Sequence, residues 1–181
     1  PKNYQYSQAL GYLAKRAVQR GDIELAITLQ KENVEVTKHA PDCNGSMWAA
    51  ALNDLAQYYS HKGQYSQAIE ACEGALEVLE KVFGTKHNFY NIILSNMASY
   101  YSFRGEKDDY EKALKLGLQA IKYIKKGTIE YAYALNALVV FYTQTGNRAE
   151  ANKLSVKARE DAMKRIDLKG INYAMVLNNN A

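Results

Sequence analysis

The sequence has few of the residues that interrupt helices or build covalent and metal frameworks. Its 181 residues include 2 Pro, 2 Cys and 3 His. With so little proline, nothing opposes long helices. Cys43 and Cys72 are too few for a disulfide framework. We therefore predict free thiols, which favours a reducing compartment such as the cytoplasm.

Long apolar runs are also missing. No segment approaches the roughly 18 consecutive apolar residues of a membrane helix, and no charged-then-apolar leader opens the chain. We expect no membrane partner, while an upstream domain or a removed signal stays open. At 48% hydrophobic and 23% charged residues, the composition is that of a chain folded throughout.

Motifs of common catalytic and metal sites are absent as well. The sequence contains no G-x-S-x-G, G-x-x-x-x-G-K or G-x-G-x-x-G, and His39, His61 and His87 lie far apart. His39 and Cys43 form one H-x-x-x-C pair, whereas a structural zinc site needs four ligands. We predict that the chain is not an enzyme and that it binds neither cofactor nor metal.

The sequence is instead dominated by an internal repeat. The segments LNDLAQYYSHKG (52–63), LSNMASYYSFRG (94–105) and LNALVVFYTQTG (135–146) align without gaps, and LGYLAKRAVQRG (10–21) fits the same template. The closing glycines, Gly21, Gly63, Gly105 and Gly146, therefore recur at intervals of about 42 residues. A fifth copy opens at Leu177.

A second helical pattern follows each glycine. In GQYSQAIEACEGAL (63–76), apolar residues recur every three or four positions and define one helix face. Small residues at Ala56 and Ala68, and at Ala98 and Ala113, let the two helices of a pair approach closely. The unit is thus a helical hairpin, and the predicted helices are 4–20, 23–38, 46–61, 65–83, 88–103, 107–126, 128–144, 147–165 and 171–181.

At these positions the sequence resembles the tetratricopeptide repeat (TPR). The second repeat supplies the residues of that motif in its spacing: Leu52, Leu55, Ala56, Tyr59, Gly63, Tyr65, Ala68 and Ala75. FGTKHNFYNIILSNMASYY (83–101) is similar to the long-repeat subfamily of kinesin light chains. Four features depart from the pattern: Asn88 in place of proline, three residues inserted before Tyr110, Arg148 in place of an aromatic residue, and Asn180 in place of an apolar one.

The resemblance implies an all-α fold, an α-α superhelix or TPR solenoid of about four helical hairpins plus one extra helix. The expected single array has repeats at about 4–41, 46–84, 88–126 and 128–167 and a partial repeat at 171–181, as a segment of a longer protein. Such arrays stack into a right-handed superhelix, because each hairpin buries its apolar stripe only against its neighbours.

The resemblance also implies a function, a scaffold that holds a peptide or helical segment of a partner protein in its concave groove. First helices line that groove, which gives the candidate residues Lys15, Asn53, Gln57, Ser60, Ser95, Ser99, Ser102, Tyr133, Asn136, Thr143 and Asn178. An asparagine ladder in the groove could bind a peptide backbone, since the amide both donates and accepts. An alternative of equal weight is that asparagine is simply common at these positions in the family and that its side chain contacts the next helix or water.

Two rival functions remain open at this stage. The excess of basic residues lies in residues 107–181, which would suit a nucleic-acid-binding regulator. Acidic residues interleave with them, however, so a solvated face is the better interpretation and nucleic acid is not the expected partner. Alternatively, the array regulates a catalytic domain outside these residues.

Overall fold

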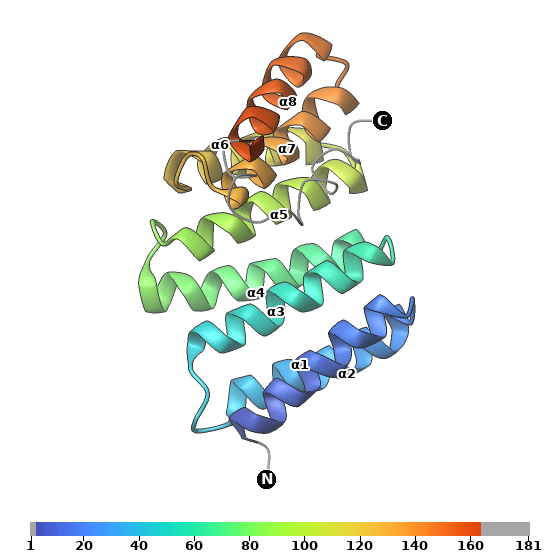
Figure 1. The fold of residues 1–181 in the computed structure, drawn as a ribbon, viewed down its shortest axis with the longest axis vertical. Helices are drawn as coiled ribbons and strands as arrows, with labels where there is room; N and C mark the ends of the chain where they lie inside the picture. The colour runs from blue at the N-terminus through green and yellow to red at the C-terminus, as the bar shows by residue number, and fades with distance from the viewer. Residues whose placement is uncertain (1–2, 164–181) are drawn as a thin grey trace. The chain divides into compact units, whose positions relative to one another are not determined.

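The computed structural model describes residues 3–163, and within that range the chain forms eight α-helices and no strand (Figure 1). Their bounds are α1 Tyr4–Gln19, α2 Ile23–His39, α3 Gly45–His61, α4 Tyr65–Phe83, α5 Asn88–Arg104, α6 Asp109–Tyr123, α7 Ile129–Gln144 and α8 Arg148–Met163. Apart from α6, these bounds agree with the predicted ranges to within about two residues, and the predicted end of the last hairpin helix at 165 lies outside the described residues. The helix predicted over 171–181 lies outside the described residues.

Two compact units make up the chain, one ending at Thr85 and the other beginning at Lys86. In the first unit α1 pairs with α2 and α3 with α4, and α2 also packs on α3. In the second unit α5 pairs with α6 and α7 with α8, and both α5 and α6 pack on α7. The predicted helical hairpins are therefore confirmed within each unit.

Local sequence sets where these helices begin and end. The side chains of Asn3, Asp22, Asn44 and Thr128 each accept a hydrogen bond from a backbone N–H in the first turn of the helix that follows. After α3 and α5, Gly63 and Gly105 have φ of 74° and 66°, a left-handed conformation that glycine adopts at least cost. The closing glycines of the repeat are thus helix terminators.

Small side chains pack the paired helices closely. Ala14, Ala26, Ala56 and Ala68 have no exposed surface, and Ala98 and Ala113 are 1% exposed. Cys72 on α4 is also fully buried, and burial raises the pKa of its thiol. The predicted packing role of this cysteine is confirmed, and the thiol is unreactive for that reason.

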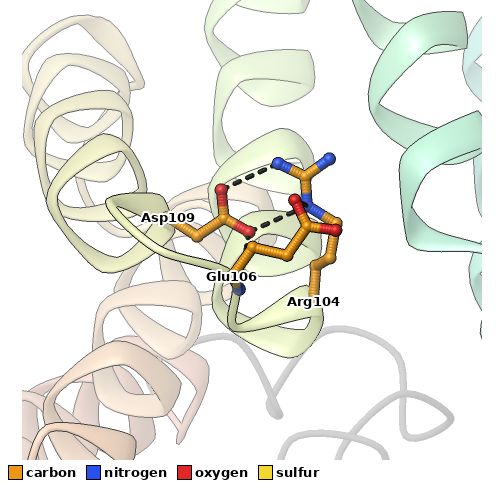
Figure 2. Close-up of polar contacts among 3 residues, drawn as sticks. All are labelled: Arg104, Glu106 and Asp109. Carbon is orange, nitrogen blue, oxygen red and sulfur yellow. Dashed lines mark hydrogen bonds and ion pairs between the residues drawn. The ribbon is translucent and has the colours of Figure 1, made fainter.

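The α5–α6 connection differs from the prediction. Helix α6 begins at Asp109 rather than 107, because the inserted residues form a loop held by an ion pair (Figure 2). The Nε and Nη2 atoms of Arg104 donate to the two carboxylate oxygens of Asp109, each over 2.8 Å, and the Glu106 backbone N–H donates to Oδ2 over 3.0 Å. The Asp109 side chain is fully buried, and Asp108 turns the chain with φ 69°. We call Arg104, Glu106 and Asp109 the loop clamp.

Helix α6 also ends earlier than predicted, at Tyr123 rather than 126. Ile124 is extended, with φ −73° and ψ 133°, and its side chain is 3% exposed. Turning Ile124 into the core stops the helix there.

Candidate functional site

The predicted groove positions recur at fixed distances from the first leucine of each repeat, so they lie on the first helix of each hairpin. In the first unit these helices are α1 and α3. Lys15 and Gln57 are exposed, Ser60 is half-buried, and Asn53 is buried at 6% exposure. Lys15, Gln57 and Ser60 can therefore meet a ligand, whereas the Asn53 side chain belongs to the interior.

A carboxylate that the sequence analysis did not select lies within electrostatic range of Lys15. Burial raises the pKa of Asp54 on α3, and the charge of Lys15 partly offsets that rise. One turn along, burial and the charge of Asp54 raise the pKa of Tyr58 to about 12. The Tyr58 hydroxyl is buried and finds no hydrogen-bond partner among residues 3–163. This face thus combines one exposed cation with a carboxylate that is costly to ionise.

In the second unit the predicted positions fall on α5 and α7. Ser95 and Ser102 are buried, at 4% and 1% exposure. Ser99 and Thr143 are more accessible, but their hydroxyls donate to helix carbonyls four residues earlier, at Ser95 and Val139. Their hydroxyl oxygens can still accept a hydrogen bond.

Tyr133 and Asn136 are the most available side chains on α7. Tyr133 is 41% exposed, and Asn136 is half-buried. Within the described part of the chain, neither the Tyr133 hydroxyl nor the Asn136 amide makes a hydrogen bond. This helix therefore presents an aromatic ring and an amide with both hydrogen-bonding functions unused. Asn178, the remaining candidate, lies outside the described residues.

Four lysines of the second helices in this unit have intramolecular partners. Three ammonium groups lie over tyrosine rings: Lys112 over Tyr101 at 5.4 Å, Lys122 over Tyr123 at 5.3 Å and Lys157 over Tyr131 at 5.6 Å from the ring centres. Lys153 also pairs with Glu150 over 3.5 Å. These contacts and the interleaved carboxylates make this surface mixed in sign.

The histidines and the possible metal ligands were the remaining candidates for a chemical site. Between residues 3 and 163 there is no group of three or more His, Cys, Asp or Glu side chains placed to hold a metal ion. His39 lies 3.5 Å from Glu35 on the exposed side of α2. The Nδ1 atom of His87 accepts from the Phe89 N–H and caps α5. Both histidines thus have structural contacts.

Comparison with known proteins points to one repeat family. Residues 48–126 match the family model "Tetratricopeptide repeat". A search of the curated proteins finds no match. Among solved structures, the chain is similar to BtubC (BKLC) from P. vanneervenii, with 17% identity and a TM-score of 0.77 over 95% of this chain and 69% of that one.

Two further similar structures come from Podosopora anserina and are described as kinesin light chain with nearly identical TPR-like repeats. One of them, a single-substitution variant, has 19% identity and a TM-score of 0.70 over 91% of this chain and 78% of its own. The other has 19% identity and a TM-score of 0.67 over 94% and 80%. The predicted fold class, an all-α tetratricopeptide solenoid, is confirmed by these matches.

Proposed function

We propose that this chain, whose residues 48–126 match the tetratricopeptide-repeat family, binds an extended or helical segment of another protein on the exposed face of its first helices. The fold itself supports a protein-interaction scaffold. One observation carries the finer proposal: Tyr133 and Asn136 lie one turn apart on α7, and their polar groups make no hydrogen bond to any residue between 3 and 163.

The second unit offers the better recognition surface. A tyrosine supplies apolar contact area and a hydroxyl with little loss of side-chain entropy on binding. An asparagine amide can donate to and accept from one peptide group of an extended segment. Ser99 and Thr143 add acceptors on α5 and α7. Such a surface reads the shape and backbone of a peptide rather than its charge.

The first unit adds a separate polar surface made by Lys15, Gln57 and Ser60. Lys15 suits an acidic or carbonyl group of the ligand, and the Gln57 amide can pair with backbone. Lys15 is exposed to solvent, where an ion pair with a ligand contributes little to affinity. The attraction between Lys15 and a charged group of the ligand should therefore contribute little to binding.

The affinity of a peptide for the second unit tests this proposal. A random peptide library displayed on phage is selected against the chain, and a selected peptide is titrated by fluorescence anisotropy. Tyr133→Ala should weaken binding about tenfold and Asn136→Ala about fivefold, as central interface side chains do. Affinity should change little between about 50 and 200 mM salt, since few ion pairs are screened.

Matched controls come from the second helices of the same unit. Tyr123→Ala on α6 and Asn152→Ala on α8 remove the same side-chain types from exposed positions and should leave the affinity unchanged. Single-stranded RNA tests the rival function. RNA binding that falls steeply with salt and is lost in Lys122/Lys125/Lys126→Ala, with Tyr133→Ala and Asn136→Ala unchanged for every ligand, would favour a nucleic-acid-binding regulator.

We keep the cytoplasm as the proposed compartment. Both cysteines are unpaired, which suits a reducing environment. Among the helices of residues 3–163, none has the length and apolar character needed to span a bilayer. A regulatory role toward a catalytic domain elsewhere stays a prediction.

A further inference from the structure

The hairpin of α3 and α4 carries a surface hollow of about 310 Å³. Its apolar walls are formed by Gly45, Trp48, Gly74, Val78 and Val82, and the exposed pair of Glu77 and Lys81 also lines it. This volume lies at the lower end of the range of about 300–1,000 Å³ for ligand pockets. We call this feature the Trp48 hollow.

The first hairpin shows what occupies the equivalent place. The repeat puts Tyr6 in register with Trp48, and Glu32 in register with Gly74. The Tyr6 hydroxyl donates to Oε1 of Glu32 over 2.8 Å. In the second hairpin, Gly74 has no side chain that could cover Trp48 in this way.

The other two hairpins also carry a long polar side chain at this place. In the fourth hairpin, Lys157 is in register with Gly74, and its ammonium group lies 5.6 Å from the ring centre of Tyr131, the counterpart of Trp48. In the third hairpin, Gln119 holds this place once the three inserted residues are counted. The Trp48 hollow is therefore the space of a side chain that the second hairpin lacks.

The charges around the hollow favour an anionic occupant. The Lys38 ammonium of α2 lies 5.6 Å from the centre of the Trp48 ring and pairs with no carboxylate among residues 3–163. Lys81 is balanced by Glu77, which lies 2.7 Å away. The indole N–H of Trp48 is buried and has no acceptor within the same range. A carboxylate would balance Lys38, whereas a second cation would be repelled by it.

The hollow lies off the face of α4 that the repeat uses for stacking hairpins. Helix α2 packs on α3 through Ile27, Gln30 and Val34. The residues in register with them on α4 line no part of the hollow: they are Ile69, Cys72 and Leu76. The hairpin that precedes α3 is present and leaves the hollow open. Extending the array at either end therefore does not supply the missing side chain.

We propose that the Trp48 hollow receives a glutamate side chain from an acidic segment of a partner protein. The methylene groups of that glutamate pack on Trp48 and Val78, and its carboxylate balances Lys38, as a charged side chain of the same hairpin covers Tyr6. Residues 164–181 contain no glutamate, so they do not offer this side chain. The site shares no residue with the surfaces proposed above, so the proposals can fail separately.

Two displayed peptide libraries test the chemistry of the occupant. One has a fixed central glutamate and the other a fixed central lysine, each between random flanks without tryptophan. Both are selected against the 181-residue chain, and only the glutamate library should be enriched. A selected peptide is then titrated while the emission of Trp48 is followed, since this is the single tryptophan of the sequence. The emission should change saturably, and glutamine in place of the peptide's glutamate should weaken binding about fivefold.

Gly74→Glu provides the sharpest variant, because it gives the second hairpin the side chain that Glu32 gives the first. The position has room, since an added Cβ would meet Leu52 Cδ1 at 3.5 Å. The new glutamate should fill the hollow and weaken peptide binding more than about tenfold. Gln67→Glu, at an exposed position of α4, adds the same charge outside the hollow and should bind like the wild type. Circular dichroism checks that both variants are folded.

Three outcomes would overturn the proposal. The first is equal enrichment of the two libraries, or of neither. The second is undiminished binding of the selected peptide by folded Gly74→Glu. The third is a change of Trp48 emission with protein concentration alone, absent from Gly74→Glu, because the occupant would then be a second copy of the chain. Tyr133→Ala should leave this binding unchanged, which separates the result from the test of the proposed function.

Discussion

At the scale of single residues, Gly117 is where packing leaves least room. A Cβ atom at this position of α6 would lie 2.6 Å from Cδ2 and 3.2 Å from Cγ of Leu138. Leu138 is 1% exposed, so its neighbours prevent it from moving aside. Gly117→Ala should lower the free energy of unfolding by about 1–3 kcal/mol through overpacking, despite the better helix propensity of alanine. Urea denaturation measures the change.

Gly74 is the matched control, since it also lies inside a helix, α4. Its added Cβ would meet Leu52 Cδ1 at 3.5 Å, an ordinary contact. Gly74→Ala should therefore stabilise the chain by about 0.5–1 kcal/mol, as expected of alanine in a helix. If both substitutions stabilised equally, the close approach of α6 and α7 would be wrong.

Residue burial also explains how far the candidate site could be predicted. The repeat fixes the angular position of a side chain on its helix, and Gln57, Tyr133 and Thr143 are accessible as expected. The repeat does not show which positions the neighbouring helices cover. Asn53, Ser95 and Ser102 were predicted as site residues, but neighbouring helices bury them. Asp54 was not predicted as a site residue, because the equivalent residues in the other repeats are uncharged. Only three-dimensional contacts bring it near Lys15.

At the scale of elements, the loop clamp joins α5 to α6. The bond from Arg104 holds the pKa of Asp109 below its usual range, so the carboxylate is ionised in the fold. Asp109→Asn removes the buried anion that accepts two hydrogen bonds from Arg104 and leaves the guanidinium only the exposed Glu106 carboxylate at 3.3 Å, so it should destabilise the second unit by on the order of 3 kcal/mol. Hydrogen exchange of the α5 and α6 amides would measure this loss locally.

The milder variant Arg104→Lys separates charge from geometry. Lysine keeps the positive charge but cannot donate two parallel hydrogen bonds to one carboxylate. Arg104→Lys should therefore cost less than Asp109→Asn yet remain destabilising. Equal stability of wild type and both variants would show that the clamp does not hold the loop.

This clamp also shows why the fold was predictable except at one connection. Helices such as α3 and α4 follow from apolar spacing and closing glycines, both local in the sequence. The start of α6 depends on Arg104 reaching Asp109 across the inserted loop. Among the several acidic residues nearby, no pattern singles out that partner. The positive φ of Asp108 was equally unpredictable, since few residues other than glycine adopt it and the adjacent Asp109 does not.

For the whole molecule, the two units should respond oppositely to acid. In the first unit the pKa of Asp54 is raised, so the fold binds its proton more readily than the unfolded chain, and stability falls as pH rises through that pKa. In the second unit the pKa of Asp109 is lowered, so its contribution is present above the unfolded pKa of about 3.9 and is lost as pH falls below it.

The single tryptophan allows the units to be followed separately. Trp48 lies on α3, so its fluorescence reports the first unit, whereas circular dichroism reports helices of both. From pH 7 to about 3, the dichroism midpoint in urea should fall further than the fluorescence midpoint. Asp54→Asn should raise the fluorescence midpoint at pH 7 but not at pH 3. Midpoints that shift together in wild type and variant would contradict this assignment.

The loop clamp also makes the α5–α6 connection a place to lengthen the chain. Arg104 and Asp109 fix the two ends, while Lys107 and Asp108 between them are exposed. Since doubling a flexible loop costs only about 0.6 kcal/mol, added sequence here is tolerated thermodynamically. An epitope or a fluorophore-binding tag placed between Lys107 and Asp108 would therefore mark the protein for imaging without disturbing α5, α6 or the surfaces proposed to bind partners.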